Sequence, residues 1–241
     1  MKYFIDTEFI EGFHKPLFGK RRHFIDLISI GIYAEDGREY YAISNEYDYN
    51  DASDWVKENV IIPMYTKEIS GDKRNHINAE TFHKYIPNGK SNKEIALDII
   101  DFVNPISSAL AAKAGVLSFS HMDKPEYWIS EHNGVRSDGK YRPRNSVFPR
   151  NPQWVAQPEF YGYYADYDWV LFCSLFGRMI DLPKGFPMYC HDLKQTFDED
   201  YPQSTRERVK QQPDYPKQQN EHNALADAKW NKRLYAFLQA N

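Results

Sequence analysis

Residues 3–9 of the chain read YFIDTEF, and we expect the fold to be organised around this stretch. Its apolar start is typical of a buried strand, which delivers two carboxylates, Asp6 and Glu8, one residue apart. Because residues i and i+2 of an extended strand point to the same face, these side chains are expected side by side. Two such charges repel each other, whereas a divalent cation takes carboxylate oxygens as ligands. The stretch therefore predicts a metal site at a strand end, unless the two acids simply lie in solvent.

The composition is that of a globular protein with a sizeable core. The chain has 241 residues, of which 41% are hydrophobic and 16% aromatic. This length suits one large domain carrying an insertion. The formal net charge of −4 does not point to a nucleic-acid binder. It does not exclude one, because carboxylates that hold metal ions count against the sum.

Nothing in the sequence predicts export or membrane insertion. The first residues lead straight into the expected strand, so no signal peptide is expected before the fold. No apolar run approaches the ~20 residues that span a membrane. Cys173 and Cys190 lie in apolar surroundings, which favours buried thiols over a disulfide or a metal pair. We therefore expect a cytoplasmic protein without a membrane partner.

The N-terminal part is expected to form a three-stranded antiparallel meander. Residues 10–23 are rich in basic residues and are interpreted as a loop, and Asp36-Gly37 is a hairpin turn signal. The expected strands span residues 2–6, 24–33 and 38–43.

Two helices are expected next. Asp51 or Ser53 could cap a helix that continues to Val60. Ser91, followed three residues later by Glu94, forms a capping-box pattern for a helix over 92–103.

Residues 105–158 interrupt this pattern and are interpreted as an insertion within a single domain spanning 1–241. They are rich in Pro, Gly, Asn and Ser and contain a basic run over 136–150, with a candidate strand at 115–120. Beyond the insertion the regular pattern returns. The expected elements are strands over 161–165 and 188–190, helices over 168–176 and 224–239, a helix capped by Asp192, and a polar loop over 199–219. The order of elements predicts an α/β fold whose mixed sheet continues in parallel strands, is flanked by helices and has the first strand in a central position.

Acidic residues recur where later elements begin. In residues 164–169, which read YADYDW, a strand meets a helix and brings Asp166 and Asp168 to the first helical turn. Either acid could be a plain helix N-cap. We prefer Asp168 as the site residue, because an aromatic residue precedes it and an apolar helix follows.

A histidine and an acid stand five residues apart near the C-terminus. His222 and Asp227 would not share a helical face, since one turn takes 3.6 residues. If Asn223 is the N-cap, Asp227 lies one turn inside the helix and His222 lies on the loop before it. That division suits a metal ligand on the helix and a proton-transferring base on the loop.

Taken together, these motifs resemble those of the DEDDh group of 3′-5′ exonucleases, which have a ribonuclease-H-like fold. Asp6 and Glu8 match its first motif, Asp168 its second, and His222 with Asp227 its third. The chain is most similar to the small exoribonucleases of the ribonuclease AS type, over residues 1–104 and 158–239. One departure is Phe9, which stands where the family usually has threonine.

The resemblance implies a two-metal-ion mechanism. Two divalent cations, Mg²⁺ or Mn²⁺, would be held by Asp6, Glu8, Asp168 and Asp227, and His222 would act as the base. The substrate would be the 3′ end of a single-stranded nucleic acid, RNA in preference to DNA, and the products nucleoside 5′-monophosphates. The relatives also suggest a homodimer. A DNA exonuclease of the same family, or an inactive nucleic-acid-binding module, remains the alternative.

Candidate contacts to the nucleic acid are an aromatic residue and several basic stretches. Phe9 follows Glu8 and could stack on a terminal base, although it could equally be a core residue. Within the insertion, Arg142, Arg144 and Arg150 could pair with phosphates. The basic stretches 15–22 and 206–217 could do the same, or each could be a solvated loop.

Overall fold

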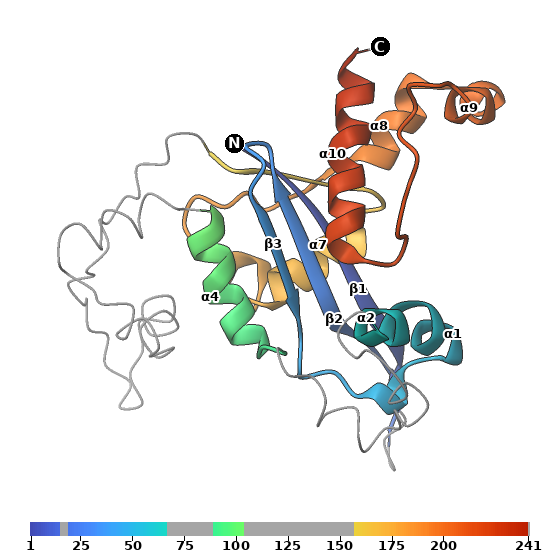
Figure 1. The fold of residues 1–241 in the computed structure, drawn as a ribbon. Helices are drawn as coiled ribbons and strands as arrows, with labels where there is room; N and C mark the ends of the chain where they lie inside the picture. Colours follow the sequence, from blue (N-terminus) through green and yellow to red (C-terminus); the bar gives the residue numbers. More distant parts are fainter. Residues whose placement is uncertain (15–18, 67–88, 104–156, 241) are drawn as a thin grey trace.

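The computed structural model describes residues 1–14, 19–66, 89–103 and 157–240, which form one mixed sheet covered by helices (Figure 1). The sheet has five strands in the order β3-β2-β1-β4-β5. The strands are β1 (Lys2–His14), β2 (Arg22–Ala34), β3 (Glu39–Ile43), β4 (Glu159–Gly162) and β5 (His191–Asp192). The first three pair antiparallel, whereas β4 runs parallel to β1 and β5 parallel to β4. The predicted α/β fold, with a meander followed by parallel strands and a central first strand, is confirmed.

The first two strands are longer than the sequence analysis predicted. The interpretation of residues 10–23 as a loop is wrong at both of its ends, because Ile10 pairs with Asp26 and His14 with Arg22. The side chain of Phe24 lies over Gly12, where a Cβ atom would come within 2.8 Å of the ring. The packing depends on Gly12 of β1 and Phe24 of β2 together. The outer part of either strand alone therefore does not show the alternation of apolar residues that predicts a strand.

The turn and caps of the N-terminal half follow their sequence signals. Gly37 has a φ of 92° in the turn between β2 and β3, as the Asp-Gly pair predicted. Ser53, one of the two proposed caps, accepts a hydrogen bond of 3.2 Å from the amide of Val56. The helix continues beyond the predicted end at Val60. It consists of α1 (Asp54–Val56), a π-helical stretch (Lys57–Ile61) and α2 (Ile62–Thr66), and it follows a 3₁₀ turn (Tyr49–Asp51).

Helices cover both faces of the sheet, and alternate residues of β1 serve the two sides (Figure 1). Tyr3 and Ile5 face a core built with α4 (Asn92–Val103) and α7 (Asp166–Ser174). Phe4 faces a second core built with α8 (Leu193–Asp200) and α10 (Ala224–Ala240). A third cluster joins Ile10 of β1 and Ile28 of β2 to Val60 and Ile61. The limits predicted for α4 and its capping box between Ser91 and Glu94 are confirmed.

Several predicted boundaries in the C-terminal half are wrong. The strand expected at 161–165 is β4 at 159–162, because it starts where it pairs with Lys2 of β1. The strand expected at 188–190 is β5 at 191–192, since Met188 and Tyr189 are exposed and pair with no strand. α7 begins at Asp166 instead of Asp168 and ends at Ser174. The loop expected at 199–219 contains α9 (Gln203–Lys210), whose polar surface gave no periodic apolar signal.

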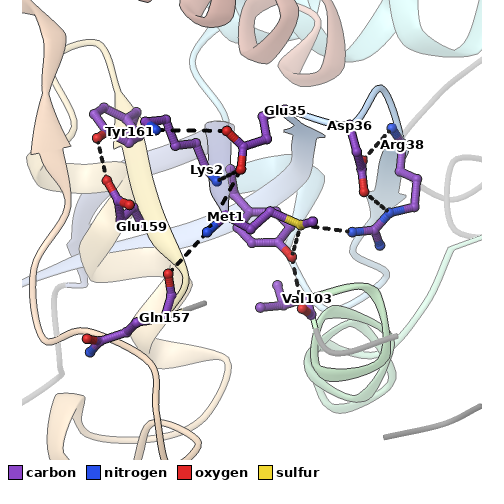
Figure 2. Close-up of polar contacts among 10 residues, drawn as sticks. Met1, Lys2, Glu35, Asp36, Arg38, Val103, Gln157, Glu159 and Tyr161 are labelled. Atoms are coloured by element: carbon purple, nitrogen blue, oxygen red, sulfur yellow. Dashed lines mark hydrogen bonds and ion pairs between the residues drawn. The ribbon is translucent and has the colours of Figure 1, made fainter. Parts of the chain in front are cut away.

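The start of β1 is fixed by polar contacts at the end remote from the two carboxylates (Figure 2). The terminal amine of Met1 donates to the carbonyl of Gln157, and the amide of Lys2 donates to Glu35. The hydroxyl of Tyr3 donates to the carbonyl of Val103 at the end of α4. The strand that carries Asp6 and Glu8 is therefore held at its first three residues.

Some predictions fall outside the described residues. These are most of the insertion at 105–158, its candidate strand at 115–120, and Arg142, Arg144 and Arg150. Where the chain is described, none of its helices is long and apolar enough to cross a membrane. Cys173 and Cys190 are free thiols, the first buried and the second half-buried.

Candidate active site

Three carboxylates from two elements meet beside the central strand. Asp6 and Glu8 project from the same face of β1, and Asp227 comes from the first turn of α10. One oxygen of each lies within 4.8 Å of an oxygen of the others. Side-chain alternation places the first two together, and the packing of α10 against the sheet adds the third.

The position of Asp227 depends on how α10 begins. Asn223 accepts a hydrogen bond of 3.1 Å from the amide of Ala226, so it is the N-cap that the sequence predicted. The first residues of α10 lie directly against Gly31 of β2, the register partner of Asp6. A Cβ atom at Gly31 would be 2.3 Å from the backbone of Ala224. Glycine at this position therefore lets the helix bring Asp227 close to β1.

Asp168 reaches the site through the backbone of β1. The pairing of β4 with β1 ends at Phe4, and no other strand of the described residues pairs with the following edge of β1 on that side. Asp168 accepts hydrogen bonds from the amide of Thr7 at 2.9 Å and from its hydroxyl at 2.5 Å. The carboxylate of Asp168 is buried. Its partner Thr7 stands between Asp6 and Glu8 in the sequence, so Asp168 is held at the part of β1 that carries these two acids. Asp168 thus replaces the missing strand partner of β1.

The structure distinguishes Asp168 from Asp166. Asp166 is exposed at the first position of α7, and neither acid is the N-cap, because Ala165 occupies that position. The amide of Ala165 donates to Asp192 at 2.8 Å, and Asp192 also caps α8 as predicted. Burial and the bonds to Thr7 favour Asp168 as the site residue.

His222 lies on the loop just before α10, where the sequence placed it. Its φ is 65°, a left-handed conformation that is uncommon outside glycine. Its amide donates to Asp227 at 3.0 Å, and the side-chain amide of Gln218 donates to the other oxygen of Asp227 at 2.7 Å. The His222 ring meets the ring of Trp55 edge-on, with centroids 4.9 Å apart. The histidine is thus tied to Asp227 through its backbone and to α1 through its ring.

Sequence reasoning missed four side chains that support this arrangement: Thr7, Trp55, Gln218 and Asn231. Asn231 is fully buried and donates to the carbonyl of Ile5 at 2.9 Å, two residues before Thr7, which Asp168 bonds. It lies four residues after Asp227 on the same helical face, which is a signal that could have identified it. The other three are recognisable only from contacts between distant segments.

The carboxylates share one poorly solvated volume, and their pKa values reflect it. Burial, with the nearby charges of Asp168, Glu8 and Asp227, raises the pKa of Asp6 well above its usual range. Burial and the neighbouring acids raise the pKa of Glu8 to about 8. Burial raises the pKa of Asp168 to about 7, although its hydrogen bonds act in the opposite direction. The pKa of Asp227 is also raised by burial. Four acids that resist ionisation in one place are typical of a functional site.

Comparison with known proteins places the chain in a family. Residues 1–239 match the model of the 3′-5′ exoribonuclease Rv2179c-like domain. The chain belongs to this family. Two relatives from Mycobacterium tuberculosis are the 3′-5′ exoribonuclease Rv2179c of strain H37Rv and the 3′-5′ exoribonuclease MT2234.1 of strain CDC 1551. Each is 27% identical over 240 residues, which cover 99% of this chain and 93% of the relative.

The donor set of this family member suits hard divalent cations. All the candidate ligand atoms are carboxylate oxygens, which Mg²⁺ prefers. Among the described residues, no lysine or arginine forms an ion pair with Asp6, Glu8, Asp168 or Asp227. Ion pairs with the described lysines and arginines therefore do not compensate the negative charge of the cluster, which bound cations would do.

The environment of Phe9 is closer to the core position that was one of its two proposed roles than to a freely exposed stacking position. It is half-buried against the core below α4 and α7, and its ring meets Tyr167 edge-on with centroids 5.4 Å apart. The exposed partner in this pair is Tyr167, which lies beside Asp168 in the sequence. This aromatic pair joins the residue after Glu8 to the residue before Asp168, and a role for Phe9 in base stacking stays a prediction.

Proposed function

We propose that this protein is a metal-dependent 3′-5′ exoribonuclease of the DEDDh type on a ribonuclease-H-like fold. It would remove nucleoside 5′-monophosphates one at a time from the 3′ end of single-stranded RNA. The observation that carries the proposal is the meeting of Asp6, Glu8 and Asp227, with Asp168 bonded to the residue between the first two. Membership of the 3′-5′ exoribonuclease Rv2179c-like domain family supports the direction and the substrate.

The four carboxylates would hold two divalent cations, Mg²⁺ or Mn²⁺. When bound, the cations would stabilise negative charge on the attacking and leaving oxygens of the phosphodiester. Asp6, Glu8 and Asp227, whose oxygens lie within 4.8 Å of one another, would be ligands together with Asp168. The bonds of Asp168 to Thr7 engage one carboxylate oxygen, and among the described residues no hydrogen bond engages the other, which would be the ligand atom.

His222 would remove a proton from the attacking water. Its neutral imidazole would accept that proton and later release it. The edge contact with Trp55 and the backbone bond to Asp227 restrict where the ring can lie. The chain therefore holds the base and one ligand of the site through the same short loop.

The preference for RNA rests on the family and on the names of the two relatives. The test is digestion of a 5′-labelled single-stranded RNA and its DNA counterpart with Mg²⁺, with Mn²⁺ and with EDTA. The proposal predicts stepwise shortening of the labelled RNA, release of nucleoside 5′-monophosphates, and no reaction in EDTA. Faster digestion of DNA would favour the DNA exonuclease, and binding without cleavage would favour the inactive module. Sedimentation of the same preparation would test the expected homodimer.

A further inference from the structure

The antiparallel pair β1–β2 continues well beyond the carboxylates. We call its outer part, residues 11–14 and 20–24, the hairpin arm. From Glu8 to His14 the strand advances six residues, which at about 3.3 Å each is roughly 20 Å. Pairing continues to His14 and Arg22, so the arm is built by regular strands. Figure 1 shows this end of the two strands opposite the N-terminus.

The arm presents an aromatic side chain to solvent. Phe13 is 53% exposed, although the ladder around it is complete. The guanidinium of Arg21 lies over its ring, 4.5 Å from the centroid, and the ring of His23 meets it edge-on at 5.4 Å. Arg21 and His23 thus orient the Phe13 ring, and the part of the ring that the fold leaves exposed is available for stacking on a base.

The charge of the arm suits an anionic partner. Lys20, Arg21 and Arg22 are consecutive and exposed. The acid on the arm is Glu11, which lies 3.6 Å from His23. Three exposed cations against one acid attract phosphates, whereas the carboxylates farther along the same strand repel them.

Strand geometry connects the arm to the site. Phe13 and Phe9 lie on the same face of β1, four residues and therefore about 13 Å apart. Phe9 contacts Tyr167, the exposed aromatic residue beside Asp168. This face of β1 is the one opposite Asp6 and Glu8, and Glu11 lies on it between the two phenyl rings. Aromatic side chains thus lead from Tyr167, the neighbour of Asp168 in the sequence, to the arm.

We propose that the hairpin arm binds the nucleotides on the 5′ side of the reacting 3′ end, with Phe13 stacking on a base and Arg21 and Arg22 contacting phosphates. This inference rests on the proposed function, because the polarity of the strand follows from a 3′ end at the carboxylates. Stacking plus an electrostatic contact to the backbone is how proteins hold single strands without reading their sequence. The arm therefore favours substrates long enough to reach it.

The test compares Phe13→Ala and the double variant Arg21→Gln/Arg22→Gln with the wild type. Affinity for a fluorescent twelve-nucleotide single-stranded RNA is measured in EDTA at several salt concentrations, so that binding needs no cleavage. Phe13→Ala should weaken binding by about 5- to 150-fold, the range for loss of one base–aromatic stack. The double variant should reduce the slope of log affinity against log salt by about 1.4. Matched controls are Tyr189→Ala and Lys93→Gln, which remove an exposed aromatic residue and an exposed cation elsewhere.

A second measurement distinguishes a loss of RNA contacts at the arm from a general structural defect of the variants. The ratio of kcat/KM for the long RNA to kcat/KM for a dinucleotide should fall in both arm variants. Unchanged affinity and salt slope would overturn the inference and leave the exoribonuclease intact. Equal losses on both substrates, or a change in sedimentation alone, would overturn it in favour of a structural or protein contact. A wild type that binds the long RNA through the arm without cleaving it would contradict the proposed function instead.

Discussion

Three local features place the four candidate site acids. Asp6 and Glu8 share a face of one strand, Asp227 follows a capped helix start, and Asp168 bonds the amide of Thr7. None of these features neutralises the charge that they bring together. Holding the acids close together therefore lowers the stability of the metal-free protein. Such a cost is expected where a bound cation supplies the compensating positive charge.

The first prediction concerns pH. The pKa of Glu8 is raised to about 8 and that of Asp168 to about 7, whereas unfolded acids titrate near pH 4. Between these values the unfolded chain has released protons that the native state retains, so the native state loses stability as pH rises. The melting temperature in EDTA should therefore fall between about pH 5 and 8 through these groups. Mn²⁺ should oppose the fall, and an equal fall with and without Mn²⁺ would contradict this account.

The second prediction separates the two acids of α7. Asp168→Asn should abolish RNA hydrolysis, because the amide removes a charge that a cation needs, yet it should leave the protein folded. Asp166→Asn is the matched control and should retain activity, since Asp166 is exposed. Turnover and thermal melting of both variants provide the check. Activity that survives in Asp168→Asn and disappears in Asp166→Asn would reverse the assignment.

The third prediction concerns the base. His222→Ala should lower kcat by roughly 10²–10⁴-fold, the usual contribution of general-base catalysis. Its Mn²⁺ affinity should remain close to that of the wild type, because His222 contacts Asp227 through its backbone amide. Calorimetric titration with Mn²⁺ in the presence of a nucleoside monophosphate makes the comparison. A large loss of affinity would place the imidazole among the ligands.

At the scale of elements, side chains from two helices bond the backbone of β1 beyond the end of its pairing with β4. Asp168 of α7 accepts from the amide of Thr7, and Asn231 of α10 donates to the carbonyl of Ile5. Buried backbone groups need such partners. The same contacts that satisfy the strand edge also position two of the site elements against it.

The fourth prediction tests the contact between β2 and α10. Gly31→Ala places a Cβ atom 2.3 Å from the backbone of Ala224, so the start of α10 must move. Overpacking of this kind costs about 1–3 kcal/mol, and displacement of Asp227 should also weaken Mn²⁺ binding. Gly37→Asn is the comparison: the space around Gly37 is open but its φ is 92°, so this variant should lose stability through backbone strain without weakening Mn²⁺ binding. Denaturant unfolding and Mn²⁺ titration would show whether stability and metal affinity fall together, and a neutral Gly31→Ala would refute the close approach.

At the scale of the molecule, the sequence predicted the features whose signals are local. Alternation placed Asp6 and Glu8 together, and the capping residues Ser91 and Asn223 located the starts of α4 and α10. The length of β1 and β2 was missed, because the support for Gly12 is the ring of Phe24 on the other strand. α9 was missed because its surface is almost entirely polar.

The contacts that hold the site residues in place were predictable only in part, because most of them join segments that are far apart in the sequence. The bond between Thr7 and Asp168 joins residues that are 161 positions apart, and the contact between Trp55 and His222 joins α1 to the loop before α10. No local pattern marks Thr7, Trp55 or Gln218 as members of the site. The resemblance of the motifs predicted the four acids, and three-dimensional packing added the residues that contact them.

Direct measurement of metal binding tests the central claim that these acids form a cation site. Mn²⁺ is titrated calorimetrically into the wild type, Asp6→Asn and the control Asp166→Asn, each with a nucleoside monophosphate. The account predicts two ions per chain in the wild type and the control, and a loss of binding in Asp6→Asn, whose melting temperature in EDTA is retained or slightly raised. Absence of Mn²⁺ binding by the folded wild type, or equal binding by Asp6→Asn, would contradict it.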